Sequence, residues 1–311
     1  MEIILLLVKQ ILAMMILVFF GFVTVKCGVI KKHQITAFSR IALYVSLPCC
    51  IFKAFLTDSD AAQLRGIAAA LILAILIHLL YYVVTKLLGR FAHVSPMGQA
   101  CIFYSNAGNF IIPLISAAIG PEYVVYVVPY LSVQIVLAWT HGTQLISGKK
   151  DWEIKKVLCN PCIIATIFGA MCFLFSWEPP IPVASAISSA GDSVGFICML
   201  VTGMLLACSK LTDVLCNMKV YLICAGRMIL MPLIIVFLFW VTNIAEMFPE
   251  LEMILMVLVI TSAAPIASTV VQFAEIYKCD VQFASVTNIA SVLFSIITMP
   301  VVIACYQWLS I

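Results

Sequence analysis

Charged residues are scarce in this sequence. Asp, Glu, Lys and Arg together make up only 10% of its 311 residues, whereas hydrophobic residues make up 64%. A soluble domain typically carries about 25% charged residues. The composition therefore excludes an ordinary soluble fold and indicates an integral membrane protein, for which chain length does not predict the number of domains.

Catalytic and metal-binding signatures are also missing. No H-E-x-x-H sequence occurs, so the paired histidines of a zinc metalloprotease are absent. Ser189–Asp192 reads SAGD, close to the GxGD of aspartyl membrane proteases, but the second intramembrane aspartate that such an enzyme needs is not there. We expect no enzyme activity, no cofactor, no metal site and no nucleic-acid partner.

The cysteines form no recognisable framework. Thirteen is an odd number, and most of them lie inside apolar runs, which favours small buried side chains over disulfides. Cys159 and Cys162 have the C-x-x-C spacing, but they open a membrane helix and no second pair accompanies them. A redox or metal role for this pair is therefore disfavoured.

The sequence consists largely of long apolar runs. A bilayer core about 30 Å thick needs about 20 apolar residues per helix. Ten spans are predicted on this scale, at residues 3–25, 36–57, 63–85, 97–119, 122–147, 159–177, 183–207, 218–243, 251–275 and 281–309. The first run is long enough to span, so we expect it to remain as a helix and not to be cleaved as a signal peptide.

Basic residues alternate between the two sets of connections. Those that follow odd-numbered spans hold Lys26, Lys31, Lys32, Lys86, Arg90, Lys149, Lys150, Lys155, Lys156, Lys210, Lys219 and Lys278. The other connections have Arg65 as their only clear cation and carry Asp58, Asp60, Glu122, Glu178, Glu246, Glu250 and Glu252. The positive-inside rule then places the lysine-rich connections in the cytoplasm and both termini on the outer face of the plasma membrane.

The connection SGKKDWEIKK is the longest polar stretch and divides the chain in the middle. We predict a first five-helix repeat at 1–147, a cytoplasmic linker at 148–158 and a second five-helix repeat at 159–311. An odd number of spans per half gives the halves opposite orientations, so the repeats must be inverted.

Two of the apolar runs are interrupted by polar and helix-breaking residues. Ser105–Leu114 reads SNAGNFIIPL, and Ala263–Gln272 reads AAPIASTVVQ. Such interruptions are tolerated at membrane depth only where protein or a water-filled cavity satisfies the freed backbone groups. Pro113 and Pro265 both fall in the fourth span of their half, and paired interruptions of this kind indicate a transporter's binding site.

Three stretches resemble the auxin efflux carrier family, which includes plant PIN-type auxin carriers and bacterial permeases for small organic anions such as malonate or malate. Their order and spacing match the family over essentially the whole chain. They are Ser46–Phe52 (SLPCCIF), Ser105–Gly120 (SNAGNFIIPLISAAIG) followed by Val133–Trp139 (VQIVLAW), and Gln272–Asp280 (QFAEIYKCD).

The resemblance implies an all-α membrane fold of ten helices shared with bile-acid/sodium symporters. Spans one, two, six and seven would form a scaffold, and spans three to five and eight to ten a transport domain. The broken fourth and ninth spans would cross at the centre of the transport domain, which would move against the scaffold like an elevator. A homodimer through the scaffold helices is left open.

The polar residues at the two interruptions are the candidate site. The N-terminus of a half-helix presents free N–H groups and a partial positive charge, which suits a carboxylate. The candidate substrate-binding residues are Asn106, Asn109, Ser268, Thr269 and Gln272, and those that would shape the crossing are Gly108, Pro113 and Pro265. The alternative is that these side chains only satisfy backbone groups that the interruptions release.

Ionisable residues within spans are functional candidates by default. Asp192 is the only carboxylate well inside a span, and proton coupling and a structural hydrogen bond are equally good interpretations. For the four in-span cations Lys9, Arg40, Lys53 and Arg227 we favour snorkelling to the membrane surface. For His78 and His141 we favour structural hydrogen bonds over a proton relay.

The function that we predict is secondary transport of a small organic anion, with mono- and dicarboxylates as the expected class and no midspan arginine to select phosphate. A membrane sensor that binds a small ligand without net transport is the main alternative. A channel would leave a continuous polar stripe, whereas polarity here concentrates at two midspan interruptions.

The predicted orientation can be tested by cysteine labelling. On a background without reactive native cysteines, Lys150→Cys should react with a membrane-impermeant reagent only after the cells are opened, because its connection is predicted to face the cytoplasm. Labelling of position 150 in intact cells would reverse the assignment.

Overall fold

The computed structural model describes residues 2–56, 61–148, 154–208, 217–248 and 251–309, and these residues are almost entirely helical. No strand is present within them. The one pairing of extended residues there is an isolated antiparallel bridge between Ser105 and Ile266. The predicted all-α class is confirmed.

Seven helices within the described ranges are long and apolar enough to cross a membrane, and three shorter apolar helices accompany them. The seven are α1 (Glu2–Lys26), η1 to α3 (Lys32–Ala54), α4 (Ala61–Phe91), η4 to α8 (Pro121–Ser147), α11 and α12 (Ile181–Asp192, Val194–Ala207), α14 to α15 (Met218–Thr242) and α19 (Val281–Leu309). The three are η3 with α6 (Ala107–Ala118), α10 (Pro161–Leu174) and α17 (Glu252–Ser262). The protein is therefore a multi-pass membrane protein.

The remaining helices are short. They are α5 (Pro96–Phe103), α9 (Ile154–Leu158), α16 (Ile244–Met247) and α18 (Ser268–Ile276). Local sequence signals set where two of the helices start. Ser95 accepts a hydrogen bond from the N–H of Gly98 and Pro96 follows it, and Asn160 with Pro161 does the same for α10. A capping side chain followed by proline is a typical start of a helix.

Small residues allow two of the long helices to lie very close. A Cβ added at Gly21 of α1 would overlap the backbone of Leu200 in α12, and one added at Gly203 would overlap the backbone of Val18. Small residues at such positions are typical of membrane helix pairs.

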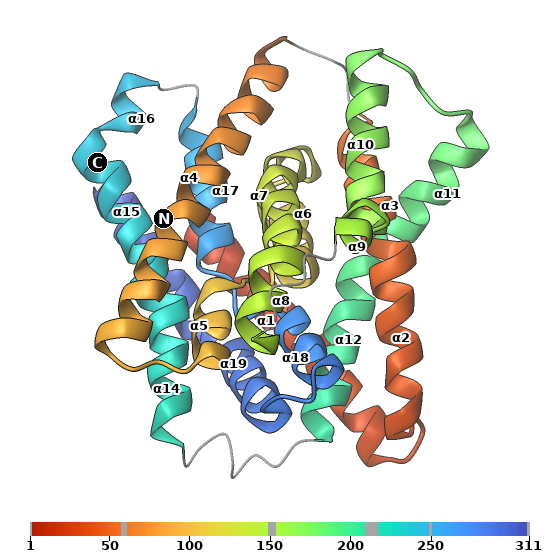
Figure 1. Ribbon diagram of the computed structural model, residues 1–311. Coiled ribbons are helices and arrows are strands. Elements are labelled where there is room, and N and C mark those ends of the chain that lie inside the picture. Colours follow the sequence, from red (N-terminus) through yellow and green to blue (C-terminus); the bar gives the residue numbers. More distant parts are fainter. Residues whose placement is uncertain (1, 57–60, 149–153, 209–216, 249–250, 310–311) are drawn as a thin grey trace.

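The helices form two groups, with α6 and α7 between them (Figure 1). In one group α1 packs along α12, and α3 packs against α10 and α11. In the other, α14 (Met218–Ala225) and α18 pack against α19, and α4 packs against the central α7 (Val124–Leu137). The chain segments that bring polar residues to the centre lie where the two groups meet.

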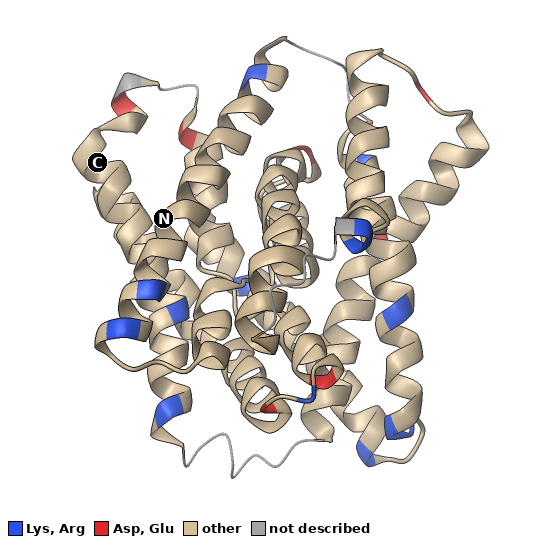
Figure 2. Ribbon diagram, in the orientation of Figure 1, with Lys and Arg blue, Asp and Glu red and all other residues tan. Residues whose placement is uncertain are grey.

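Charged residues are unevenly distributed along the helices. Figure 2 shows most Lys and Arg residues in the lower half of the view, while acidic residues lie at the top and at a few places below. Arg65, which we assigned to a connection, lies in the first turns of α4 instead. Residues Asp58, Asp60, Lys149, Lys150, Lys210 and Glu250, on which the predicted orientation also depends, lie outside the described residues.

Candidate functional site

Two interrupted helices meet inside the protein. The chain leaves the helix at residues 104–106, between α5 and η3, and again at 263–267, between α17 and α18. These two stretches, which we call the crossing, run antiparallel. The N–H of Asn106 donates to the carbonyl of Pro265 (2.8 Å), and the N–H of Ala267 donates to the carbonyl of Tyr104 (3.0 Å). The two polar stretches of the sequence are therefore in direct contact.

Amide and hydroxyl side chains satisfy the backbone groups that point away from this pairing. Gln134 of α7 accepts from the N–H of Ser105 (3.0 Å) and donates to its carbonyl (2.7 Å). On the other extended stretch, Asn288 of α19 donates to the carbonyl of Ile266 (2.6 Å), and Ser291 accepts from the N–H of Ile266 (2.9 Å). Buried backbone groups need such partners in a bilayer.

Arg227 of η6 (Gly226–Leu230) donates hydrogen bonds to carbonyl groups at the helix ends that lead into the crossing. Its side chain is fully buried. Its guanidinium donates to the carbonyls of Ile102 (3.3 Å), Ser262 (2.9 Å) and Ala264 (3.2 Å). It also lies over the ring of Tyr81, 5.6 Å from the centroid. The predicted snorkelling of Arg227 is therefore wrong, and an arginine is present at the midspan crossing after all.

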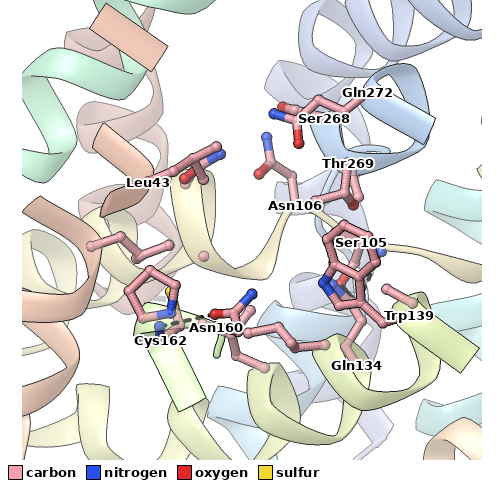
Figure 3. A pocket seen from close by; sticks show the side chains of 18 of the residues that line it. Leu43, Ser105, Asn106, Gln134, Trp139, Asn160, Cys162, Ser268, Thr269 and Gln272 are labelled. Atoms are coloured by element: carbon pink, nitrogen blue, oxygen red, sulfur yellow. Dashed lines mark hydrogen bonds between the residues drawn. The ribbon is translucent and has the colours of Figure 1, made fainter. Parts of the chain in front are cut away.

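A cavity of about 140 Å³ borders the crossing (Figure 3). Its wall comes from η2 (Ala42–Ser46) and α3, from the crossing with η3 (Ala107–Ile111), from α7 with η5 (Ala138–Gly142), and from the starts of α10 and α18. The lining residues are Leu43, Tyr44, Leu47, Ser105, Asn106, Gly108, Asn109, Leu131, Gln134, Ile135, Ala138, Trp139, Asn160, Pro161, Cys162, Ala267, Ser268, Thr269 and Gln272. None of these residues is charged, and the volume suits a small solute.

All five predicted substrate-binding residues line this cavity, as does Gly108. Asn106 is only 6% exposed, yet its side-chain amide has no hydrogen-bond partner within the described parts of the chain. The amide of Asn109 is engaged, because its oxygen accepts from the thiol of Cys198 (3.5 Å). A buried amide without a partner at the wall of a cavity is available to a ligand.

Three helices begin at the cavity wall. They are the helix that starts at Ala107, α10 with its cap Asn160, and α18, whose start has no side-chain cap. The first N–H groups of a helix have no partner within the helix and carry partial positive charge. Together with the amides, these helix ends present hydrogen-bond donors to whatever occupies the cavity.

Lining residues that the sequence analysis did not name as site candidates include Gln134, Trp139 and Asn160. Gln134 is an amide in an apolar span, the same signal that identified Asn106. Trp139 lies beneath the ammonium group of Lys156, which is 5.0 Å from the ring centroid. Asn160 looked like part of a C-x-x-C motif, although its position before Pro161 is that of a helix cap.

Other candidates lie away from the cavity or take structural roles. Pro265 lies in the crossing, whereas Pro113 lies within the unbroken helical segment 107–118, seven residues after the interruption. Asp192 is exposed at the end of α11 and pairs with Lys53 at 2.7 Å, so Lys53 has a specific partner that snorkelling does not describe.

Both in-span histidines make hydrogen bonds. Nδ1 of His78 donates to the carbonyl of Ala74 (2.7 Å), and Nδ1 of His141 pairs with the hydroxyl of Tyr104 (3.0 Å). These contacts agree with the structural role that we favoured for them.

A family model described as "Membrane transport protein" matches the chain over residues 6–153 and 149–303. The two matched segments meet within the connection that the sequence analysis placed at the middle of the chain. No curated protein matches the chain.

The role of Gln134 can be tested through stability. Gln134→Leu introduces an apolar side chain of similar size and leaves the N–H and carbonyl of Ser105 without their partner, at a cost of about 1–3 kcal/mol for each buried group. Thermal unfolding of the purified protein should show a clear loss. The control is Gln10→Leu in α1, whose amide makes no hydrogen bond within the described residues, and it should not lower the stability. Equal losses in the two variants would contradict the supporting role of Gln134.

Proposed function

The chain belongs to the membrane transport protein family, and from this we propose that it is a secondary transporter that moves a small organic anion across the plasma membrane. Membership in the family also confirms the resemblance to auxin efflux carriers. Mono- and dicarboxylates are the substrates that we propose.

The observation that carries the proposal is the chemistry of the cavity wall. It combines the unpartnered amide of Asn106 with three helix starts, and no Asp or Glu lies among its lining residues. Amide and backbone N–H donors bind carboxylate oxygens with charge-assisted hydrogen bonds, which are roughly twice as strong as neutral ones. The lining holds no carboxylate to neutralise a cation, whereas its amide and backbone N–H donors can neutralise an anion.

We also propose the architecture that such a carrier requires. Seven long and three shorter apolar helices would together provide ten membrane spans, with the interruptions in the fourth and the ninth. The partners of the crossing support two inverted repeats, since each extended strand is held by an amide from the last span of its own half, Gln134 or Asn288.

Alternating access would follow from the two helix groups. The cavity lies between the proposed scaffold, which contributes η2, α3 and α10, and the proposed transport domain, which contributes the crossing, α7 and α18. Movement of one group past the other would expose the cavity to either side of the membrane in turn, as an elevator does. Coupling to protons through Asp192 stays a prediction, because that residue pairs with Lys53 and does not line the cavity.

Solute flux into proteoliposomes tests the proposal directly. Uptake and efflux of a panel of labelled carboxylates should show at least one saturable flux that depends on the protein. Flux restricted to cations or neutral sugars would refute anion transport. Saturable carboxylate binding without flux would identify a sensor built on a transporter fold.

Asn106→Ala should weaken substrate binding. The substitution removes donors at the cavity while the backbone bond from Asn106 to Pro265 remains, so folding should survive. Loss of a hydrogen bond to a charged group costs about 1.5–3 kcal/mol, or roughly ten- to a hundredfold in affinity. Isothermal titration calorimetry and flux measurements should both show the lower affinity.

The matched variant is Pro113→Ala. Pro113 does not line the cavity, so we expect binding to be retained while the altered helix lowers flux. If Asn106→Ala binds as tightly as the parent, the asparagine only supports the crossing.

Lys156 should raise the local concentration of the anion. Its ammonium group lies over Trp139 at the cavity wall, and the adjacent Lys155 is also exposed. Lys156→Gln should lower the apparent affinity by about two- to fivefold at low salt, and the difference should shrink at high salt because surface charges are screened. Lys155→Gln is the control, and equal losses in both variants would show only a general charge effect.

A further inference from the structure

Arg227 lies where the carbonyl ends of two interrupted helices converge. Ile102 belongs to the last turn of α5, Ser262 ends α17, and Ala264 follows in the crossing. The three carbonyl oxygens of these residues all accept from one guanidinium group. The last carbonyls of a helix have no partner within it and carry partial negative charge, so this position selects a cation.

The arginine is paired with no carboxylate. No Asp or Glu within the described ranges forms an ion pair with Arg227, and its guanidinium also lies over the ring of Tyr81. A buried charge is costly unless it is compensated. Here the compensation comes from three backbone carbonyl dipoles and from the ring face of Tyr81, which attracts a cation through its quadrupole.

Carbonyl oxygens at the ends of discontinuous membrane helices are also the groups that hold Na⁺ in many secondary transporters. Three of them converge here, and the guanidinium group occupies the space between them. We propose that Arg227 is a built-in cation that fills the coupling-ion position at the crossing, so that no Na⁺ is needed to neutralise the three converging carbonyl oxygens.

A fixed cation has a second consequence. A coupling ion leaves the site in each cycle, whereas a guanidinium group on η6 remains with the crossing throughout. The carbonyl ends of the interrupted helices stay neutralised, while the N–H ends on the cavity side stay free for an anion. This consequence rests on the proposed transport of anions, but the occupation of the carbonyl site does not.

The first test uses the unaltered protein. Its unfolding temperature is measured in detergent with NaCl, with choline chloride at equal ionic strength, and with guanidinium chloride at low millimolar, non-denaturing concentration. Because Arg227 occupies the site, neither Na⁺ nor guanidinium should produce a saturable rise over choline. A saturable rise with Na⁺ would overturn the proposal.

The second test empties the site. Arg227→Ala leaves three carbonyls without a donor and a space the size of a guanidinium group, so the unfolding temperature should fall. Na⁺ or guanidinium should then restore part of the loss in a saturable way. The exposed Arg40→Ala is the matched control and should show neither the loss nor the recovery. A loss that neither ion reverses would overturn the proposal.

A third comparison covers the case in which Arg227→Ala does not fold. Arg227→Lys keeps the charge, and Arg227→Gln keeps N–H donors but removes the charge. A lysine variant that unfolds at a higher temperature than the glutamine variant supports a built-in cation. The reverse order would show that hydrogen bonding alone matters and would overturn the proposal.

None of these readouts depends on transport, so a failure of the flux assay leaves the proposal standing. Where flux is found, replacing Na⁺ by choline on both sides of the membrane should leave its rate unchanged. A flux that requires Na⁺ would contradict the built-in cation while supporting the transporter.

Discussion

The need to satisfy backbone groups inside a bilayer is the constraint on which this structure depends. An intact membrane helix meets it internally, but an interrupted one frees N–H and carbonyl groups that cost several kcal/mol each when unpaired in hydrocarbon. The protein meets this need by placing two interruptions against each other. Tyr104 and Asn106 pair with Ala267 and Pro265, and side chains from α7 and α19 satisfy the groups between them.

This arrangement separates the two kinds of helix end. The carbonyl ends of α5 and α17 point to Arg227, where a single side chain neutralises them. The N–H ends of η3 and α18 border the cavity, where no protein group of opposite charge meets them. The crossing therefore acts as a fixed dipole that is compensated on one side only. Under the proposed function, an anion in the cavity would complete the compensation, and stability and ligand preference would then have the same physical origin.

Much of this was predictable from apolar runs and helix breakers. The interruptions and the five candidate residues at their edges were found because amides, Gly and Pro are costly in a membrane helix. The pairing of the two extended stretches with each other could not be predicted from the sequence, because which backbone groups meet depends on tertiary contacts. Arg227 was misassigned for a related reason. Its position nearer the inner end of its predicted span suggested snorkelling, whereas its partners are carbonyls at the ends of α5 and α17, which are distant in sequence.

The buried amide side chains of this protein all look alike in the sequence, as polar residues in apolar runs. They differ in the groups with which they form hydrogen bonds. Gln134 and Asn288 direct their amides to the backbone of the crossing and hold it. Asn106 contributes its backbone N–H to the same crossing, but its side chain remains without a partner in the described chain. An amide engaged by backbone has little left for a solute, whereas an unengaged one at a cavity wall must find a partner there. Asn106 is therefore available to a solute, whereas the supporting amides are not. Asn109 is intermediate in availability, because its oxygen accepts from the thiol of Cys198.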